Sequence, residues 1–334
     1  MPNNIQTITI IGDGGWGTTL ASYLALKKYR VILWGAFPDY VEILKKKRVN
    51  TKFLPGHKIP SSVTLTSDLK FAIAKSDLIV LATPSQYLRG TLQKIKRTGF
   101  PKDKIFLSVV KGIDPQTLQR MSEVIYEELG LVKLAVLSGP TIASELAAGV
   151  LTTAVIGCDD LSLAQKLQKV FHSEIFRIYI NTDVIGVELG GSVKNVIALA
   201  GGICDGMGLG TNAKAALMTR GLVEMSRLGQ ALGAKKESLF GLTGLGDLIT
   251  TCMNTKSRNR TVGEQIGRGK KINTILSGME MVAEGVITTK AVYKLGKKLG
   301  VKMPITEEVY KVIYNNKNIK KAITDLMLRD LKHE

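Results

Sequence analysis

Lys194 is the residue whose position raises the first question about chemistry. It is the one lysine in the run VELGGSVKNVIALAGG, residues 187–202, which is built mainly of Gly, Val, Ile, Leu and Ala. If this run is a buried helix, an ammonium within it costs free energy unless it is compensated. Two interpretations stand at this point: a lysine that snorkels out of the helix to water, or an amine retained because it transfers protons.

A glycine pattern near the start of the chain indicates a nucleotide site. The segment GDGGWG places Gly12, Gly14 and Gly17 at G-x-G-x-x-G spacing, after the strand-like run TITIIG and before the helical pattern TTLASYLALKK. In such a junction Gly12 permits the tight turn, Gly14 lets a pyrophosphate approach the backbone, and Gly17 allows close packing of helix on strand. The helix N-terminus then offers free N–H groups to the phosphates. This context predicts dinucleotide binding.

The end of the second strand-like run leaves the choice of dinucleotide open. An acidic residue there would bind a ribose hydroxyl, but the run ends LWGAFPDY, with Ala36 and Phe37 at the expected place. Asp39 comes late for that role, and no basic residue stands there to hold a 2′-phosphate. NAD and NADP both remain open.

Two glycine-rich connections are interpreted as loops, residues 201–212 and 240–264. The second contains Asp247 and the cluster Ser257–Arg260. If Ser257 caps a following helix, its hydroxyl, backbone N–H groups and an arginine converge on one point, where a phosphate fits. A capped helix with solvated arginines is an equally good interpretation of the same residues.

Composition excludes several classes of protein. The chain has 334 residues, 45% hydrophobic and 22% charged, which is typical of a soluble protein with two sizeable cores. The three cysteines and three histidines are widely spaced, so no disulfide framework and no metal site are expected. No signal sequence is expected, and no apolar stretch approaches the ~20 residues of a membrane span. A cytoplasmic location is the simplest expectation.

The formal net charge of +18 suggests nucleic acid or an anionic membrane surface as partners. However, the lysines are scattered and no aromatic residues are interleaved with them. We therefore expect solvated lysine faces and neither kind of partner. A positive field still assists capture of a phosphorylated substrate and an anionic cofactor.

Periodicity divides the chain into two parts. Short apolar runs typical of buried strands occur at 7–12, 30–35, 77–84, 104–112, 134–140, 152–157 and 175–180, with helical segments between them, notably 114–129 and 161–171. From about residue 183 helical patterns replace them, at 212–234 with Asn212 as N-cap, 257–268, 286–300 and 306–315. We predict a Rossmann-type α/β domain with a mainly parallel sheet over residues 1–185, and an all-α substrate and catalytic domain over 186–334.

Eight segments together resemble one family, the bacterial NAD(P)-dependent sn-glycerol-3-phosphate dehydrogenases. They are GDGGWGTTLA (12–21), KGID (111–114), SGPTIASELAAG (138–149), ELGGSVKNVIALAGGICDG (188–206), NAKAALMTRGLVEM (212–225), GLTGLGDLITTC (241–252), SRNR (257–260) and VAEG (282–285). The resemblance implies reduction of dihydroxyacetone phosphate to sn-glycerol 3-phosphate by hydride from NAD(H) or NADP(H). It also implies supply of that product to phospholipid synthesis, and a homodimer.

The resemblance assigns roles residue by residue. Lys194 is similar to the catalytic acid/base, with Lys111 as a second active-site lysine and Asp247 beside them. Substrate contacts are implied for Lys111, Gly139, Thr141, Lys194, Asn195, Asp247, Ser257, Arg258 and Asn259. Cofactor contacts are implied for Gly12, Gly14, Gly15, Trp16, Gly17, Lys111, Ala143, Arg258, Val282 and Glu284.

The implied role of Lys194 makes sense of its position. Burial and a second ammonium at Lys111 are both expected to lower its pKa from about 10.4, which would make the amine usable as an acid and as a base. The sequence departs from the family at Ala36 and Phe37, where relatives carry polar residues, and at Gly15, where serine is common. These departures concern the choice of cofactor and not the reacting centre.

Two other functions remain as alternatives. A β-hydroxyacid dehydrogenase or ketopantoate reductase would share a glycine loop and a catalytic lysine, although SRNR and GLTGLGD favour a phosphorylated three-carbon substrate. A nucleotide-sensing or nucleic-acid-binding module would account for the basic charge. It would leave Lys111, Lys194 and Asp247 unexplained.

Overall fold

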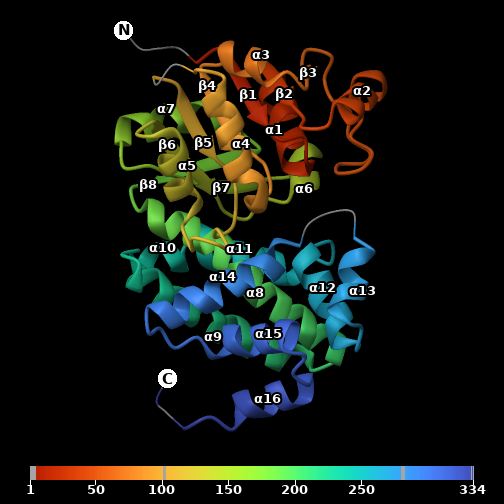
Figure 1. The fold of residues 1–334 in the computed structure, drawn as a ribbon, viewed down its shortest axis with the longest axis vertical. Helices are drawn as coiled ribbons and strands as arrows, with labels where there is room; N and C mark the ends of the chain where they lie inside the picture. Colours follow the sequence, from red (N-terminus) through yellow and green to blue (C-terminus); the bar gives the residue numbers. More distant parts are fainter. Residues whose placement is uncertain (1–4, 101–102, 280–282, 332, 334) are drawn as a thin grey trace. The chain divides into compact units, whose positions relative to one another are not determined.

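The computed structural model describes residues 5–100, 103–279, 283–331 and 333. The chain divides into two compact units (Figure 1). Unit 1 comprises Met1–Lys111 and Gln119–Glu188, and unit 2 comprises Gly112–Leu118 and Leu189–Glu334. The short segment 112–118 therefore belongs with the C-terminal part of the chain, although it is preceded and followed by residues of unit 1.

Unit 1 is built on an eight-stranded sheet within the described residues, in the order β3-β2-β1-β4-β5-β6-β7-β8. All neighbours are parallel except β6 and β7. The strands are β1 (Thr7–Ile11), β2 (Arg30–Trp34), β3 (Thr64–Thr66), β4 (Leu78–Leu81), β5 (Ile105–Ser108), β6 (Lys133–Ser138), β7 (Thr152–Gly157) and β8 (Phe176–Asn181). The predicted mainly parallel sheet is confirmed.

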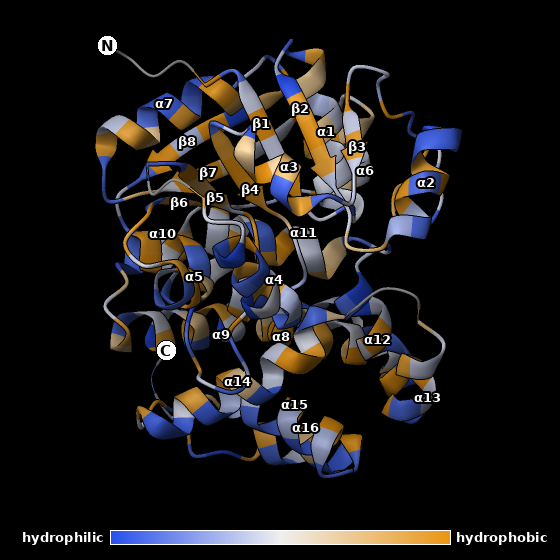
Figure 2. Cartoon of the chain, turned by 45° about the horizontal axis from the view of Figure 1, so that its top comes forward, coloured by the Kyte–Doolittle hydropathy of each residue, from blue (hydrophilic) through white to orange (hydrophobic). Residues whose placement is uncertain are grey.

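Both faces of the central strands are buried. On β1, Ile8 and Ile10 belong to one apolar cluster and Ile11 to another, as expected where successive side chains point to opposite faces. Figure 2 shows β2 and β4 as predominantly hydrophobic. The helices of unit 1 are α1 (Gly15–Leu26), α2 (Pro38–Lys47), α3 (Leu69–Ala74), α4 (Ser85–Arg97), α5 (Met121–Leu129), α6 (Ala143–Ala147) and α7 (Leu161–Phe171). Burial on both faces explains why the strands are continuous apolar runs.

Two details of the first half of the chain differ from the sequence prediction. The strand β3 was not predicted. The helix predicted over 114–129 begins only at Met121, because Asp114 accepts hydrogen bonds from the backbone N–H groups of Gln116 and Thr117 and so forms a turn. Leu118 then has a positive φ of 63°, which a helix cannot contain.

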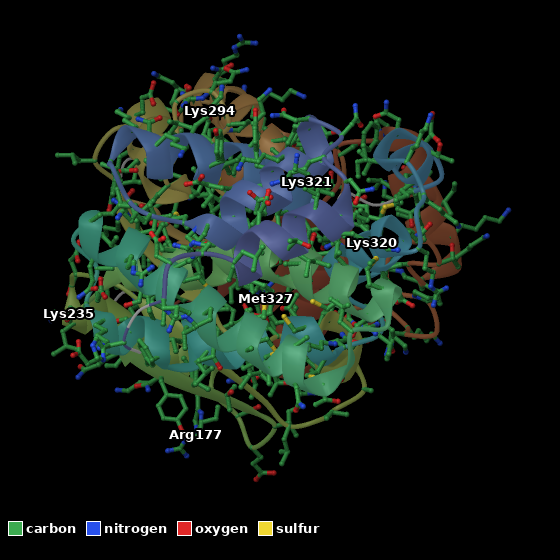
Figure 3. All side chains as sticks on the ribbon, turned by 90° about the horizontal axis from the view of Figure 1, so that it is seen from below. Arg177, Lys235, Lys294, Lys320, Lys321 and Met327 are labelled. Atoms are coloured by element: carbon green, nitrogen blue, oxygen red, sulfur yellow. The ribbon has the colours of Figure 1, made fainter. Side chains whose placement is uncertain are left out.

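The remaining helices are α8 (Val184–Met207), α9 (Gly210–Ala231), α10 (Lys236–Phe240), a π-helix (Leu242–Gly246), α11 (Asp247–Met253), α12 (Arg258–Gly267), α13 (Ile272–Ser277), α14 (Glu284–Lys298), α15 (Pro304–Tyr314) and α16 (Ile319–Met327). The predicted all-α second part is confirmed. Figure 3 labels Lys320, Lys321 and Met327, which come from α16. Met327 is largely exposed, as are Leu328 and Leu331 beyond it.

The segment 201–212 was wrongly interpreted as a flexible loop, because α8 continues to Met207. Its glycines serve helix packing. A Cβ at Gly202 or Gly206 would come within 3.0 Å of backbone atoms of α12, and a Cβ at Gly263 or Gly267 would do the same to α8. We call these four residues the glycine seam. Since no side chain fits between them, the two helix backbones lie in direct contact.

Other helix limits also correct the prediction. The segment 240–264 is not a loop, since it holds the π-helix, α11 and most of α12. Asn212 is not an N-cap, because α9 already begins at Gly210, after Leu209. Gly208 and Gly210 both have positive φ, so the chain reverses two residues earlier than the Asn212 signal indicated.

Helix α8 is long and apolar enough to cross a membrane by length and composition, and it is the one such helix among the described residues. The statement that no apolar stretch approaches that length was therefore wrong. Within the structure, 89% of its most apolar window is buried, as expected for the central helix of a helical core.

Candidate active site

Lys194 is buried on α8 and forms an ion pair. Its Nζ donates to Asp247 Oδ1 at 2.8 Å and to Thr251 Oγ1, and the side chains of Lys194 and Asp247 are only 7% and 3% exposed. Thr251 in turn donates to the backbone carbonyl of Asp247 at 2.7 Å. The alternative of a lysine that snorkels to water is excluded by this geometry. The amine is held at a defined point inside unit 2.

Asp247 reaches Lys194 because of an unusual turn. The GLTGLG sequence forms a π-helix that leads directly into α11, of which Asp247 is the first residue. A Cβ at Gly190 of α8 would lie 2.6 Å from the carbonyl oxygen of Thr243, so glycine is required for the π-helix to approach α8. π-helices are rare and occur often at functional sites. Here the π-helix places the carboxylate of Asp247 beside the amine of Lys194.

A second buried contact joins three helices beside Lys194. Asn259 of α12 donates to Asn195 Oδ1 at 2.9 Å and accepts from the N–H of Gly285 in α14, also at 2.9 Å. Asn195 and Asn259 are both buried. Arg258 and Glu284 directly precede Asn259 and Gly285 in the chain, so both lie next to this network.

Arg258 is the first residue of α12 and has an exposed side chain. Part of the side chain reaches the surface, while the protein around the guanidinium desolvates it and lowers its pKa; the nearby carboxylate of Glu284 acts in the opposite direction. Ser257 is the N-cap of α12, as predicted, and its hydroxyl accepts from the N–H of Arg260. Arg258, Ser257 and the helix N-terminus thus come together. Val282, an implied cofactor contact, lies outside the described residues.

Unit 1 brings together a separate group of predicted residues. Lys111 follows β5, and its Nζ donates to the carbonyl of Gly139 at 3.0 Å and to Thr141 Oγ1 at 3.4 Å. Gly139 follows β6 with φ of 133°, a value that favours glycine. Since β5 and β6 are parallel, these residues lie at the same carboxyl edge of the sheet.

The glycine loop lies at the carboxyl end of β1, between β2 and β4, where the strand order changes direction. Gly12 has φ of 120°, and a Cβ there would lie 2.8 Å from the carbonyl oxygen of Ala82. A Cβ at Gly17 would collide with the Gly12 carbonyl. Ligands of open α/β sheets bind at such a switch point.

Gly15 and Ala143 lie next to each other at this loop. The Cβ of Ala143 is 3.9 Å from the Cβ position of Gly15, and Thr19 of α1 donates to the Ala143 carbonyl at 3.0 Å. A Cβ at Gly15 would approach the Phe53 carbonyl oxygen to 2.6 Å, which explains why serine is absent here. Trp16 packs edge-on against Phe176 with ring centroids 6.4 Å apart.

The loop fits a dinucleotide pyrophosphate. Nothing lies within 4 Å of the Cβ position of Gly14, so the backbone is open to an approaching group. Helix α1 begins at Gly15 with no side-chain cap and no acidic residue in its first turn. An uncapped N-terminus with an open approach suits the two phosphates.

Sequence reasoning missed Thr251 and Ser192. Thr251 lies four residues after Asp247, a helical spacing that could have indicated a shared face. Ser192 of α8 accepts from the N–H of Gly112 at 2.9 Å and donates to its carbonyl at 3.2 Å. Nothing local in the sequence indicates that contact across 80 residues.

Comparison with known proteins identifies the family of the chain. The family models for the N-terminus and the C-terminus of NAD-dependent glycerol-3-phosphate dehydrogenase match residues 7–164 and 183–324. The chain belongs to this family. A glycerol-3-phosphate dehydrogenase [NAD(P)+] of Prosthecochloris aestuarii is 47% identical over 331 residues, covering 98% of this chain and 99% of the relative. The enzyme of that name from Chlorobium phaeobacteroides strain BS1 is 48% identical, covering 98% of each.

A solved structure is also similar. The crystal structure of glycerol-3-phosphate dehydrogenase from Coxiella burnetii has a TM-score of 0.94 and 36% sequence identity, covering 97% of this chain and 99% of that one. Family membership decides against the ketopantoate reductase and nucleic-acid-binding alternatives. This dehydrogenase chain uses a nicotinamide cofactor, NAD(H) or NADP(H).

Proposed function

We propose that this dehydrogenase interconverts dihydroxyacetone phosphate and sn-glycerol 3-phosphate with Lys194 as the acid/base. The observation that carries the assignment is the buried Lys194–Asp247 pair with its 2.8 Å contact. A buried ammonium with a fixed direction can donate to an oxygen on which negative charge develops. The bound nicotinamide supplies the hydride in reduction and accepts it in oxidation.

Each direction of the reaction asks for a different protonation state of Lys194. In reduction, the ammonium gives a proton to the ketone oxygen as that oxygen becomes an alkoxide. In oxidation, the neutral amine takes the proton of the secondary hydroxyl. Burial disfavours the ammonium, whereas the Asp247 carboxylate favours it.

Arg258 and Ser257 are proposed to hold the substrate phosphate. Arg258 is exposed and charged at the N-terminus of α12, and the helix dipole favours an anion there. Asn259 is proposed as a positioning residue, because both ends of its amide already contact Asn195 and Gly285. Binding the phosphate fixes the orientation of the ketone relative to Lys194.

Unit 1 is proposed to hold the cofactor and to contribute substrate contacts. The N–H groups after Gly14 would bind the pyrophosphate, with Trp16, Lys111 and Ala143 as further cofactor contacts implied by the family. The family also implies cofactor contacts for Arg258, Val282 and Glu284, which belong to unit 2. Lys111, Gly139 and Thr141 are proposed as substrate contacts, supported by the hydrogen bonds that already gather them. The domain limits 1–185 and 186–334 are part of this proposal.

The test is oxidation of NADH or NADPH with dihydroxyacetone phosphate, compared with unphosphorylated ketoacids. We expect turnover with the phosphorylated ketone, and its loss in Lys194→Ala with cofactor binding retained. Lys214→Ala is the matched control, since Lys214 pairs with Asp205 in the same unit and has no proposed role in the chemistry. An active Lys194→Ala enzyme would refute the assignment of the acid/base.

The cellular setting is proposed from the family. We propose a cytoplasmic homodimer that supplies glycerol 3-phosphate to phospholipid synthesis. The exposed apolar side chains of Met327, Leu328 and Leu331 support an association surface near α16. Light scattering in solution tests the dimer, and a mass equal to one chain would contradict it.

A further inference from the structure

The carboxyl end of β2 lacks the acidic residue that binds adenosine ribose in many dinucleotide enzymes. Trp34 ends the strand and Gly35, Ala36 and Phe37 follow it. Ala36 is exposed, and Phe37 is 71% exposed. Asp39 also points to solvent, in the first turn of α2. The strand itself therefore provides no directed carboxylate.

A carboxylate nevertheless stands at this place, supplied by the glycine loop. Asp13 is the residue between Gly12 and Gly14, and its Oδ2 lies less than 3.0 Å from the position that a Cβ of Gly35 would take. The carboxylate of Asp13 thus occupies the space of a side chain at the end of β2. Gly35 leaves that space free.

Asp13 is also firmly positioned. Its backbone carbonyl accepts from Asn50 Nδ2 at 2.7 Å and from Thr18 Oγ1 at 3.3 Å. Asn50 is fully buried and also contacts Tyr40 and Phe53, so it is fixed from several sides. The loop is therefore held in one conformation, with the Asp13 carboxylate at the β2 end.

One oxygen of this carboxylate has no hydrogen-bond partner within the described part of the chain. Oδ2 of Asp13 is buried, and desolvation raises the pKa of the carboxyl group. A buried acceptor without a donor is unfavourable, and it leaves the carboxylate with hydrogen-bonding capacity that the described chain does not use. Asp13 as a residue is only partly buried, so a bound ligand can approach the rest of its side chain. Ribose offers two neighbouring hydroxyl donors of the required kind.

The charge around this point disfavours a 2′-phosphate. Residues 34–44 contain no Lys, Arg or His, while Asp39 and Glu42 add negative charge. The next cations along the chain, Lys45, Lys46, Lys47 and Arg48, lie at the far end of α2, and Arg48 donates to the carbonyl oxygens of Pro60 and Val63. A 2′-phosphate requires a cation near the ribose, and a carboxylate in direct contact with it repels it.

We propose that Asp13 accepts hydrogen bonds from the adenosine ribose hydroxyls and makes the enzyme selective for NAD(H) over NADP(H). This inference rests on the proposed function only in using the same cofactor site. It assigns to the loop a role that other dinucleotide enzymes give to the end of the second strand.

Equilibrium binding of NADH and NADPH, measured by isothermal titration calorimetry, tests the proposal without turnover. We expect wild type to bind NADH at least about tenfold more tightly than NADPH, in line with loss of one strong hydrogen bond and gain of a repulsion. Asp13→Asn and Asp13→Ala should each reduce the ratio of the two Kd values about tenfold or more. Asp39→Asn, a nearby exposed carboxylate, should leave the ratio within about twofold.

The ratio protects the test against partial misfolding, because both cofactors are titrated into the same preparation and an inactive fraction affects both equally. Wild type that binds NADPH as tightly as NADH would overturn the proposal, as would an unchanged ratio in both Asp13 variants. If the enzyme turns over dihydroxyacetone phosphate and prefers NADPH to NADH, this inference is refuted and the proposed function stands. Asp13-dependent NADH binding without any turnover would do the reverse.

Discussion

The buried ion pair of Lys194 and Asp247 makes a quantitative prediction for Asp247→Ala. The substitution removes the carboxylate that faces an ammonium on a side chain only 7% exposed. Removal of one member of a buried ion pair costs about 3–5 kcal/mol in free energy of unfolding. For a unit of this size, about 2–4 °C is lost per kcal/mol, so Tm should fall by about 6–20 °C.

A second substitution separates the charge from the lost contacts. In Lys194→Met/Asp247→Ala the buried charge is gone, so the double variant should be more stable than Asp247→Ala although it lacks two native side chains. Calorimetry on wild type, Lys194→Met, Asp247→Ala and the double variant completes the double-mutant cycle. Glu307→Ala is the control, because it breaks the surface pair with the half-exposed Lys297 and should cost under about 1 kcal/mol.

The same variant tests catalysis through its pH profile. Without the carboxylate the neutral amine of Lys194 is favoured, so the residual oxidation of glycerol 3-phosphate should extend to lower pH than in wild type. A loss of stability under about 1 kcal/mol, or a double variant no more stable than Asp247→Ala, would refute the energetic argument. An unchanged pH profile would show that Asp247 stabilises the fold without affecting the protonation of Lys194.

Three further predictions concern other parts of the chain. Burial raises the pKa of Glu224 from 4.5 to about 7, so the folded state binds the proton more tightly than the unfolded state. The free energy of unfolding should therefore fall by about 3 kcal/mol as pH rises from 4.5 to above 7. Urea unfolding at pH 5 and pH 8 measures this fall, and Glu224→Gln should remove most of it. Arg258→Ala should raise the KM for dihydroxyacetone phosphate about tenfold or more with a smaller change in kcat, whereas Arg268→Ala at the other end of α12 should leave KM unchanged; equal KM values would remove the phosphate role. Gly263→Ala should destabilise the protein by about 1–3 kcal/mol or more because its Cβ meets the Leu199 carbonyl, while Gly90→Ala in the open on α4 should stabilise it by about 0.5–1 kcal/mol, and thermal melting compares the two.

Much of the fold follows from the sequence because its signals are local. The strands β1, β2, β4 and β5 are apolar runs buried on both faces, and each was found within a few residues. The glycine loop was found because strand, turn and helix succeed one another there. In contrast, β3 is a three-residue edge strand with one buried side chain, too short to stand out from a turn.

Glycine was the main source of error in the secondary structure predicted for the second half of the chain. A run such as GGICDGMGLG is typical of a loop when it is read locally, because glycine weakens helices by about 1 kcal/mol each. In the structure that cost is offset by the seam, in which Gly202 and Gly206 meet Gly263 and Gly267. The partner helix lies some sixty residues away, so local periodicity cannot reveal the contact.

The candidate site was predictable from the sequence only where its signals are local. Lys194 stands out by type, and Ser257 by its capping position. The pairing of Lys194 with Asp247 depends on the π-helix, which has no established sequence signature, and on contact across 53 residues. Asp13 could not be predicted as a ribose contact, because ribose recognition usually lies at the end of the second strand and the sequence does not show that the Asp13 side chain reaches that place.

The glycine seam has a consequence for the distance between Lys194 and Arg258. Helices α8 and α12 carry Lys194 and Arg258, and their backbones touch at the seam and are joined again by Asn195 and Asn259. The helices cannot slide past one another without breaking both. Within unit 2 the span from Lys194 to Arg258 is therefore set by main chain and not by adjustable side-chain packing. Under the roles proposed for these two residues, a fixed span would select substrates by the number of carbons between ketone and phosphate.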